Sequence, residues 1–415
     1  MSLAVTGALL EGETVGLRAE EGLIAELAPG VKPRNGDEVL DAGGAPLVPG
    51  LVNGHTHAAM TLFRGYGDDL PLMQWLEEKI WPLEARLEPK DVYWGTRLAC
   101  LEMIRSGTVR FWDMYWHPEA TARAVEDAGL RATIAAPLIE AGKGLESLRE
   151  GALRNLEQLA GCGERISAAL APHAIYTVGE EGLRWVAELA AQRELPVHIH
   201  LSETEQEMAD CVNEHGLRPV HHLDRLGVLG PGALLAHGVW LDDEELELAA
   251  ERGATIVTNP VANLKLAVGR VFPYRKAREV GVAIGLGTDG AGSNNSLDLL
   301  ADLKTFALLQ RNEAGDPAAV TAEEAWEVAT GRRAPLLGAS GRLAPGEPAD
   351  FLLLRADAPE LSLGDLTADL VYAAAGAVVD TCVVAGRILM RAGSVEGADE
   401  VIAKAVERAR GLGLA

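Results

Sequence analysis

The chain has 415 residues, of which 48% are hydrophobic and 24% charged, and this composition excludes a disordered or collagen-like protein. Its length exceeds one average domain and fits a barrel of about 250 residues with a smaller second domain. The formal net charge of -24 would repel phosphate backbones and anionic lipids, so we expect no nucleic-acid and no membrane partner.

The first segment, residues 1–46, contains short β-prone runs such as 14–18 and 23–27, interrupted by glycine and aspartate. From Leu47 onward, short apolar runs alternate with longer amphipathic stretches, which is the pattern of repeated strand–helix units in a parallel sheet. Eight such units predict a closed barrel over residues 49–340. The eight runs begin near Leu47, Thr108, Arg131, Ile166, Pro196, Ala233, Ala254 and Val282.

After about Ser340 the pattern returns to turns and short strands, with the turn-rich run 345–350 before the apolar run 351–354. Both ends of the chain are therefore β-rich. We expect residues 1–48 and 341–415 to pair as one small β domain, a sandwich, beside the barrel. The predicted fold class is α/β, a (β/α)8 TIM-type barrel with this composite domain.

The four cysteines are far apart and form no CxxC pair, which favours reduced thiols over a disulfide framework or a thiolate zinc site. No basic segment followed by an apolar run opens the chain, and no run of about 18 apolar residues occurs. We therefore expect a soluble, cytoplasmic protein. The sequence leaves open whether it forms a homo-oligomer.

Two histidines, His55 and His57, end the first barrel strand in the run PGLVNGHTH. Residues two apart in a strand share a face, so both imidazoles can reach one metal ion. The alternative for this pair alone is two ordinary core or surface histidines.

Two later strands end in comparable side chains. The fifth supplies a second HxH pair, His198 and His200, and the eighth ends in Asp289. Imidazoles with one carboxylate suit zinc, or else iron or another divalent metal. All these groups lie at the carboxyl ends of predicted strands, which is where barrel enzymes carry their chemistry. Spacing leaves open which of His198 and His200 binds the metal, and the other would be a core histidine.

Two more histidines, His173 and His237, end the fourth and sixth strands, although either alone would more often be structural. Four others fall in predicted helices or loops and are interpreted as surface residues: His117, His215, His221 and His222. Three glycines near the eighth strand form a GxGxxG pattern: Gly285, Gly287 and Gly290. We do not interpret it as a dinucleotide loop, because that loop belongs to the first unit of an open sheet.

Four motifs extend these observations: PGLVNGHTHAAMTLFRG, HLSETEQE, NPVANLKLA and GLGTDGAGSNNSLDL. Together they resemble the amidohydrolase superfamily, in particular its deaminases of 5'-methylthioadenosine and S-adenosylhomocysteine. The likeness covers nearly the whole chain. It implies that one divalent metal ion, zinc before iron or another metal, is held by four side chains: His55, His57, His200 and Asp289. Binuclear relatives carry a lysine at the end of strand four, and residues 166–178 contain none.

The resemblance also implies the catalytic residues. Glu203 would take a proton from the metal's water and pass it to the adenine ring, which it would also contact, as general acid–base catalysis requires. Asp289 would assist, and His237 would orient the water. For Glu203 the alternative is an acid at a helix start, stabilised by the helix dipole.

The same resemblance implies a purine nucleoside substrate. Trp75 and Glu84 match positions that contact the ribose, and His173 and Ser293 match positions that contact the purine ring. Residues nine apart on an unbroken helix face opposite sides, so we expect Pro82 to break the helix and let Trp75 and Glu84 converge. Without the resemblance, Trp75 would be a core residue and Glu84 a solvated charge.

One position departs from the family. Several relatives that accept S-adenosylhomocysteine have an arginine after the third strand that binds its carboxylate, and here that position is Ala136. Lys143 or Arg149 could replace it, without a guaranteed bidentate contact. The departure favours 5'-methylthioadenosine or adenosine as the substrate.

The function predicted is hydrolytic deamination of the adenine ring of 5'-methylthioadenosine, S-adenosylhomocysteine or adenosine, with release of ammonia and an inosine-type product. One alternative is the same centre acting on guanine, cytosine or a triazine, but Trp75 and Glu84 argue against it because a free base has no ribose hydroxyls. Another is an inactive barrel that serves as a scaffold or binding module. The complete set of candidate ligands argues against that alternative.

Overall fold

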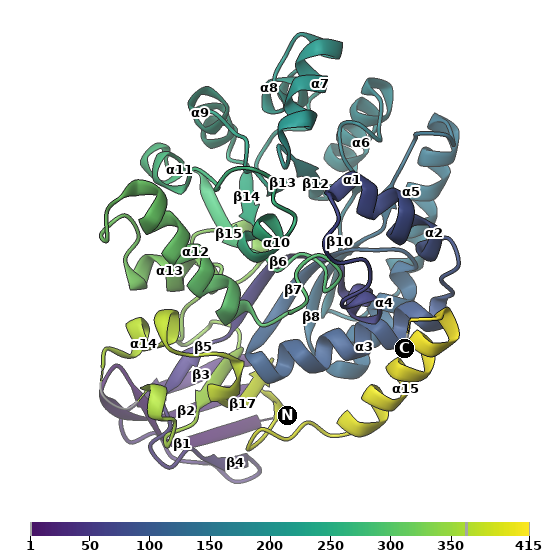
Figure 1. The fold of residues 1–415 in the computed structure, drawn as a ribbon. Coiled ribbons are helices and arrows are strands. Elements are labelled where there is room, and N and C mark those ends of the chain that lie inside the picture. The colour runs from purple at the N-terminus through teal and green to yellow at the C-terminus, as the bar shows by residue number, and fades with distance from the viewer. Residues whose placement is uncertain (1, 362–363, 415) are drawn as a thin grey trace.

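A ring of parallel strands is the centre of the fold (Figure 1). The computed structural model describes residues 2–361 and 364–414. Within them, β6, β7, β8 and β10 pair in one parallel sheet and β12–β15 in another. A bridge from Leu170 to Val197 links the two sheets on one side, and the Asp289 amide donates to the His55 carbonyl (3.0 Å) on the other. The eight strands are β6 (Leu51–Thr56), β7 (Thr108–Met114), β8 (Arg131–Ala135), β10 (Ile166–Ala168), β12 (Val197–Leu201), β13 (Ala233–His237), β14 (Thr255–Thr258) and β15 (Ala283–Leu286).

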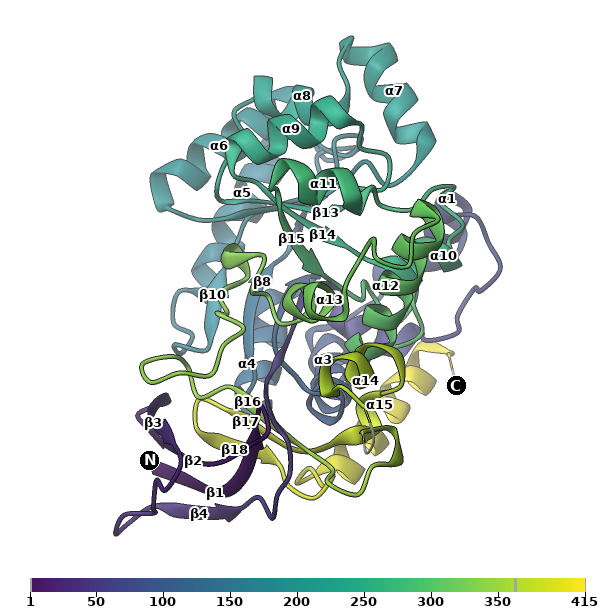
Figure 2. The ribbon, with the colours of Figure 1, turned by 90° about the vertical axis from the view of Figure 1, so that its left-hand side faces the viewer.

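Helices surround this ring (Figures 1 and 2). Every residue of β12 and β13 is buried, as expected for parallel strands covered on both faces. The predicted α/β barrel is therefore confirmed. The outer helices are α3 (Pro89–Ser106), α4 (Pro118–Ala128), α5 (Leu145–Leu159), α6 (Glu180–Arg193), α7 (Glu205–His215), α8 (Pro219–Arg225), α9 (Asp243–Arg252), α11 (Tyr274–Val280), α12 (Leu299–Ala314) and α13 (Ala322–Ala329). The short helix α10 (Pro260–Lys265) lies over the centre of the ring in Figure 1.

Two four-stranded sheets form a sandwich beside the barrel (Figures 1 and 2). Leu17, Phe351 and Val383 lie in the core that the two sheets share, so both ends of the chain contribute to it. The first sheet has the order β3-β2-β1-β4, with β1 (Ser2–Leu10), β2 (Glu13–Glu20), β3 (Leu23–Ala28) and β4 (Glu38–Asp41). The second has the order β18-β17-β16-β5, with β5 (Leu47–Pro49), β16 (Phe351–Leu354), β17 (Val379–Val384) and β18 (Arg387–Met390).

The apolar run from Leu47 is divided between the two parts of the fold at Gly50. Before it, β5 pairs antiparallel with β16 of the sandwich, and after it β6 pairs in parallel with β7 of the barrel. A Cβ atom at Gly50 would lie 2.3 Å from Cγ1 of Val109. Glycine is required here because the chain passes this close to its neighbour.

The two last helices contact the barrel. Helix α14 (Leu366–Tyr372) packs against α12 and α13, and α15 (Ala398–Leu412) packs along α3, as Figure 1 shows. Nε of Arg408 donates to Oδ1 of Asp91 at 2.5 Å. We therefore propose that the small domain consists of the strands from residues 1–48 and 341–415, with α14 and α15 counted with the barrel. Across the described ranges, no helix combines the length and apolarity needed to span a membrane.

Candidate metal centre and substrate pocket

The candidate ligands meet at one end of the barrel because each lies at, or within three residues of, the carboxyl end of a strand. His55 and His57 belong to the end of β6, His200 lies near the end of β12, and Asp289 follows β15. Ser202, His237 and Asp289 have left-handed φ values of 53°, 77° and 61°. Such conformations are costly for residues other than glycine and often occur at functional sites, where they redirect a side chain.

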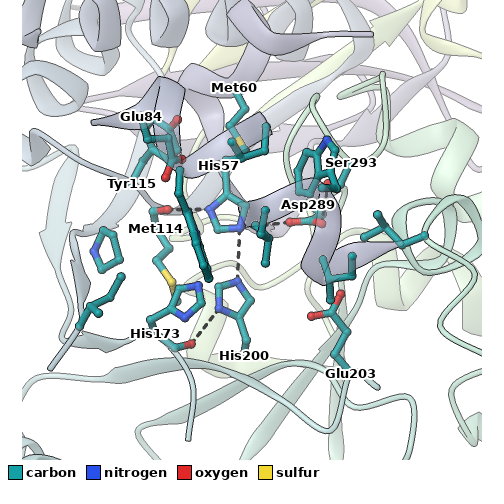
Figure 3. Close-up of a pocket in the computed structure, with 18 of the residues that line it drawn as sticks. His57, Met60, Glu84, Met114, Tyr115, His173, His200, Glu203, Asp289 and Ser293 are labelled. Atoms are coloured by element: carbon teal, nitrogen blue, oxygen red, sulfur yellow. Dashed lines mark hydrogen bonds and ion pairs between the residues drawn. The ribbon is translucent and has the colours of Figure 1, made fainter. Parts of the chain in front are cut away.

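Three side chains converge closely in this cluster (Figure 3). Nε2 of His57 lies 3.3 Å from Nε2 of His200 and 3.2 Å from Oδ1 of Asp289. Nε2 of His55 lies 3.3 Å from the same oxygen. The nitrogens that His55, His57 and His200 direct into this space lie within 4.8 Å of one another. A single cation can therefore be reached by all of them.

Hydrogen bonds at Nδ1 of His57 and of His200 determine which nitrogen of each ring faces the cluster. Nδ1 of His57 donates to the carbonyl of Met114 at 2.6 Å, and Nδ1 of His200 donates to the carbonyl of His173 at 2.8 Å. Nε2 of His57 and Nε2 of His200 then face each other across 3.3 Å, beside the carboxylate of Asp289. Both nitrogens and that carboxylate can bind one cation, and this donor set fits a divalent metal ion.

The carboxylate of Asp289 is ionised in this setting. Burial raises its pKa, but the contacts with His55 and His57 outweigh burial and hold the pKa well below its ordinary value. Its second oxygen, Oδ2, accepts a 2.6 Å hydrogen bond from the Ser293 hydroxyl. Burial lowers the pKa of His57, yet Asp289 more than compensates and raises it to about 9. The cluster thus attracts positive charge.

We expected His198 to be a core histidine if His200 is the ligand. It is buried, and its ring contacts the ring of His55. Its Nε2 lies 2.8 Å from Nδ1 of His55, and neither side chain is exposed. Burial lowers the pKa of His55 to about 3 and that of His198 well below its ordinary value, so both rings are neutral. For His55 to present an Nε2 lone pair, its Nδ1 must donate to His198. A metal-binding histidine commonly makes such a second hydrogen bond.

Glu203 lies just beyond His200, on the opposite side of the pocket from Glu84 (Figure 3). Burial raises its pKa, so that it is better suited to accept and return a proton. Oε1 of Glu203 lies 3.8 Å from Nδ1 of His237, which is also 2.9 Å from Oδ1 of Asn263.

Glu207 is a functional candidate that the sequence reasoning missed. Its carboxylate accepts hydrogen bonds from the backbone N–H groups of Ser202 and Glu203, both at 2.8 Å. It thereby holds the turn that carries Glu203. The signal for it is a Thr204-x-x-Glu207 spacing at the start of α7, which is typical of a helix N-terminus, and Thr204 indeed accepts from the Glu207 amide.

A pocket opens above the cluster and includes the predicted substrate contacts. Its lining contains Trp75, Glu84, His173 and Ser293 as well as Glu203. His173 is half-buried, and desolvation of its ring lowers its pKa to about 4, so it is neutral at pH 7. Burial also raises the pKa of Glu84, whose Oε2 accepts a 3.1 Å hydrogen bond from Nε1 of Trp116.

The reason that Trp75 and Glu84 face the same pocket differs from our expectation. The helix does not break at Pro82; α1 (Leu72–Trp75) continues through a π-helical segment, η2 (Leu76–Ile80), into α2 (Trp81–Glu84). The predicted break is therefore wrong. A π-turn holds more residues than an α-turn, so it rotates Glu84 back towards the side that carries Trp75.

Several pocket residues were not singled out from the sequence. Met114 ends β7, Tyr115 and Trp116 follow it, and all three line the pocket. Tyr176 lines it beside His173. The position of the first three at the carboxyl end of a barrel strand is a signal that could have identified them.

Two other interpretations can now be compared with the structure. His222 is not a surface residue: only 1% of it is exposed, and its ring stacks on that of His215 at a centroid distance of 4.0 Å. The GxGxxG glycines serve close packing, since a Cβ at Gly287 would lie 2.3 Å from Oδ1 of Asn259. Because Gly287 has no side chain, the backbone after β15 can lie close to Asn259 and to the backbone of His55.

A family model described as the amidohydrolase family matches residues 47–389. The chain belongs to the amidohydrolase family. This amidohydrolase is 45% identical over 402 residues to a 5'-deoxyadenosine deaminase of Methanoregula boonei, with 94% of this chain and 90% of the relative covered. It is 46% identical over 379 residues to a 5-methylthioadenosine/S-adenosylhomocysteine deaminase of Moorella thermoacetica, with 90% and 88% covered.

A solved structure extends the comparison. An adenosine deaminase from Xanthomonas campestris with bound zinc superposes with a TM-score of 0.91 at 32% identity, and the match covers 100% of this amidohydrolase and 98% of that chain. The family resemblance inferred from the four motifs is confirmed.

Proposed function

We propose that this amidohydrolase hydrolyses the exocyclic C–N bond of an adenine nucleoside and releases ammonia. The observation that carries the proposal is the convergence of His57, His200 and Asp289 beside Glu203, at the floor of a pocket that Trp75 and Glu84 also line. The names of the relatives, which are deaminases of 5'-deoxyadenosine, methylthioadenosine and adenosine, support the same substrate class.

We propose zinc as the divalent ion, with His55, His57, His200 and Asp289 as its ligands. Three imidazole nitrogens and one carboxylate oxygen are a donor set that zinc prefers, and the Xanthomonas campestris relative contains zinc. An ion held there supplies a Lewis acid that makes water nucleophilic near neutral pH.

The side chains of this protein would then manage the protons. Glu203 takes a proton from the attacking water and delivers it to the ring nitrogen next to C6, as its burial and raised pKa favour. Asp289 accepts the second water proton, which passes to the departing amine. His237 orients the water through the nitrogen that does not face Asn263. Water and the adenine nucleoside thus give ammonia and an inosine-type product.

Binding would depend on the upper pocket. We propose that Glu84 accepts hydrogen bonds from ribose hydroxyls while Trp75 packs against the nucleoside. His173 and Ser293 would contact the purine ring from the two sides of the cluster. The low pKa of His173 leaves it neutral, so that it can donate to a ring nitrogen without adding charge.

Another amino-heterocycle as substrate, such as guanine, cytosine or a triazine, is less favoured because the half-buried carboxylate of Glu84 would lack hydroxyl partners. An inactive scaffold is less favoured because it has no need for three histidines and a carboxylate that converge on one point. A cytoplasmic location and a homo-oligomeric state stay predictions.

A panel of nucleosides and bases tests the proposal. The purified protein with one equivalent of zinc is incubated with adenosine, 5'-deoxyadenosine, methylthioadenosine, S-adenosylhomocysteine, guanine and cytosine, and ammonia is measured. We expect release from adenine nucleosides and none from free bases. Release from guanine or cytosine alone, or from nothing, would refute the proposal.

A further inference from the structure

The strand that carries His55 and the loop that carries Asp289 meet where the two barrel sheets adjoin. Strand β6 belongs to one sheet and β15 to the other, and within the described ranges no ladder of strand pairs joins them. The contact between the two backbones includes the hydrogen bond from the Asp289 amide to the His55 carbonyl, at 3.0 Å. Regular strand pairing therefore does not set the distance between these two candidate ligands.

A pair of buried polar residues occupies this junction of β6 and β15. Asn53 lies on β6, two residues before His55, and Thr288 directly precedes Asp289. The Thr288 amide donates to Oδ1 of Asn53 at 3.0 Å, and Nδ2 of Asn53 donates to Oγ1 of Thr288 at 2.7 Å. Neither residue is exposed. A backbone N–H can only donate, so it fixes the orientation of the Asn53 amide, and the pair takes the place of strand pairing.

Every polar group of Thr288 has a hydrogen-bond partner. Its hydroxyl also donates to the Asp289 carbonyl at 3.1 Å, and its own carbonyl accepts from Nδ2 of Asn294 at 2.8 Å. These bonds hold the backbone next to Asp289, whose φ of 61° is left-handed. Such a conformation persists only where the surroundings over-determine it. The fixed backbone directs Oδ1 of Asp289 towards Nε2 of His55 and of His57, at 3.3 Å and 3.2 Å.

The junction is closely packed beside this pair. A Cβ atom at Gly287 would lie 2.9 Å from the backbone nitrogen of His55 and 3.0 Å from its carbonyl oxygen. Loop and strand are therefore in direct backbone contact. A shift of Thr288 relative to Asn53 would move Asp289 relative to His55.

We propose that Asn53 and Thr288 are positioning residues that set the distance between His55 and Asp289 for a divalent ion. Neither lines the substrate pocket, so they act through the two candidate ligands. The inference rests on the proposed function, because it takes over the proposed ion, and it adds what holds two of the ligands at binding distance. Residues that orient metal ligands in this way are commonly worth about 10-fold to 100-fold in metal affinity.

Thr288→Val tests the inference because it removes the hydroxyl and nearly preserves the shape of the side chain. Nδ2 of Asn53 and the Asp289 carbonyl then lose their partner. We expect zinc affinity, measured by competition with a chromogenic chelator, to fall about 10-fold to 100-fold. Thr288→Ser restores the hydroxyl and should recover most of the affinity. Thr255→Val is the matched control: it removes a buried hydroxyl at the amino end of β14, and its zinc affinity should equal that of the wild type.

Urea unfolding of the zinc-free proteins separates positioning from a merely structural role. A pair that only stabilises the fold would lower the free energy of unfolding in Thr288→Val and leave zinc affinity unchanged, and this result would overturn the inference. An equal loss of affinity in Thr255→Val would also overturn it. If Thr288→Val does not fold, Asn53→Ala removes the same pair from its other side and should show the same fall in affinity.

Activity at saturating zinc separates this inference from the proposed function. In Thr288→Val, kcat for 5'-deoxyadenosine should fall while KM stays near the wild-type value, because the substitution leaves Trp75 and Glu84 in place. If the wild type binds zinc more tightly than Thr288→Val but releases no ammonia from any nucleoside, the deaminase proposal fails and the positioning role stands. If the wild type deaminates 5'-deoxyadenosine and Thr288→Val binds zinc equally tightly, the positioning role fails alone.

Discussion

Glu203 combines burial, a raised pKa and a position next to the candidate ligand His200, but its side chain lies outside the cluster of nitrogens. Glu203→Gln keeps the size of the side chain and removes its ability to accept a proton. We expect kcat to fall between about 100-fold and 10,000-fold, as for loss of a general acid–base group. Zinc content, measured by elemental analysis, should stay at one equivalent; near-normal kcat would refute the proposed role.

His198 acts one hydrogen bond away from the ion, through Nδ1 of His55. His198→Leu removes the acceptor, so we expect zinc affinity to fall about 10-fold to 100-fold, the usual cost of losing such a partner. His198→Gln retains an acceptor and should recover much of the affinity. Competition with a chromogenic chelator measures both, and equal affinities for Leu, Gln and wild type would contradict the role.

Asp302 on α12 is a buried carboxyl that accepts hydrogen bonds from Asn294 (3.0 Å) and the Val261 amide (3.3 Å). Burial raises its pKa from 3.8 to about 8. Between these two pH values the folded state keeps a proton on Asp302 that the unfolded state has lost. The contribution of this carboxyl to stability is therefore full below about pH 4 and declines as pH rises towards 8. In Asp302→Asn the free energy of unfolding should fall less between pH 5 and pH 8 than it does in the wild type. Urea titrations of both proteins at the two pH values measure this difference.

At the scale of elements, the π-helical segment Leu76–Ile80 sets the angle between Trp75 and Glu84. Deleting the exposed Glu78 should convert the segment to a regular helix. Trp75 and Glu84 would then be separated by one residue fewer and lie about 80° apart around the helix axis, so Glu84 should still face the pocket. We therefore expect the KM for a nucleoside to stay near the wild-type value, as in the control Glu78→Ala, which keeps the length. A rise of KM of about tenfold in the deletion alone, the effect of losing one charged hydrogen bond, would contradict this account of the π-turn.

The strands of the barrel and the residues that end them could be predicted because apolar runs and strand-end histidines are local patterns. The π-turn could not, since it depends on how the helix packs over the pocket and leaves no period in the sequence. Pro82 suggested a break, but a proline near the start of a helical segment is tolerated. Spacing also could not show which of His198 and His200 is the metal ligand. Both side chains face the barrel interior, and only their distance from the carboxyl end of the strand differs.

At the scale of the whole molecule, the proposed ion joins the two sheets that make up the barrel. His55 and His57 come from the sheet of β6, whereas His200 lies in the sheet of β12 and Asp289 follows β15 of that sheet. Removing the ion should lower Tm, because a ligand at a thousand times its Kd contributes about 4 kcal/mol to folding. Calorimetry before and after dialysis against a chelator measures this, with zinc restoring Tm. A scaffold without a metal site would show no change.

The division of one strand at Gly50 also has a consequence for engineering. Five residues beyond that glycine stands His55, so the sandwich anchors the very segment that carries two candidate ligands. A circular permutant opened at this point would sever the anchor from the reaction centre. We therefore expect permutants to tolerate new termini in the exposed loop near Gly315, directly after α12, better than at Gly50, where the sandwich meets the barrel.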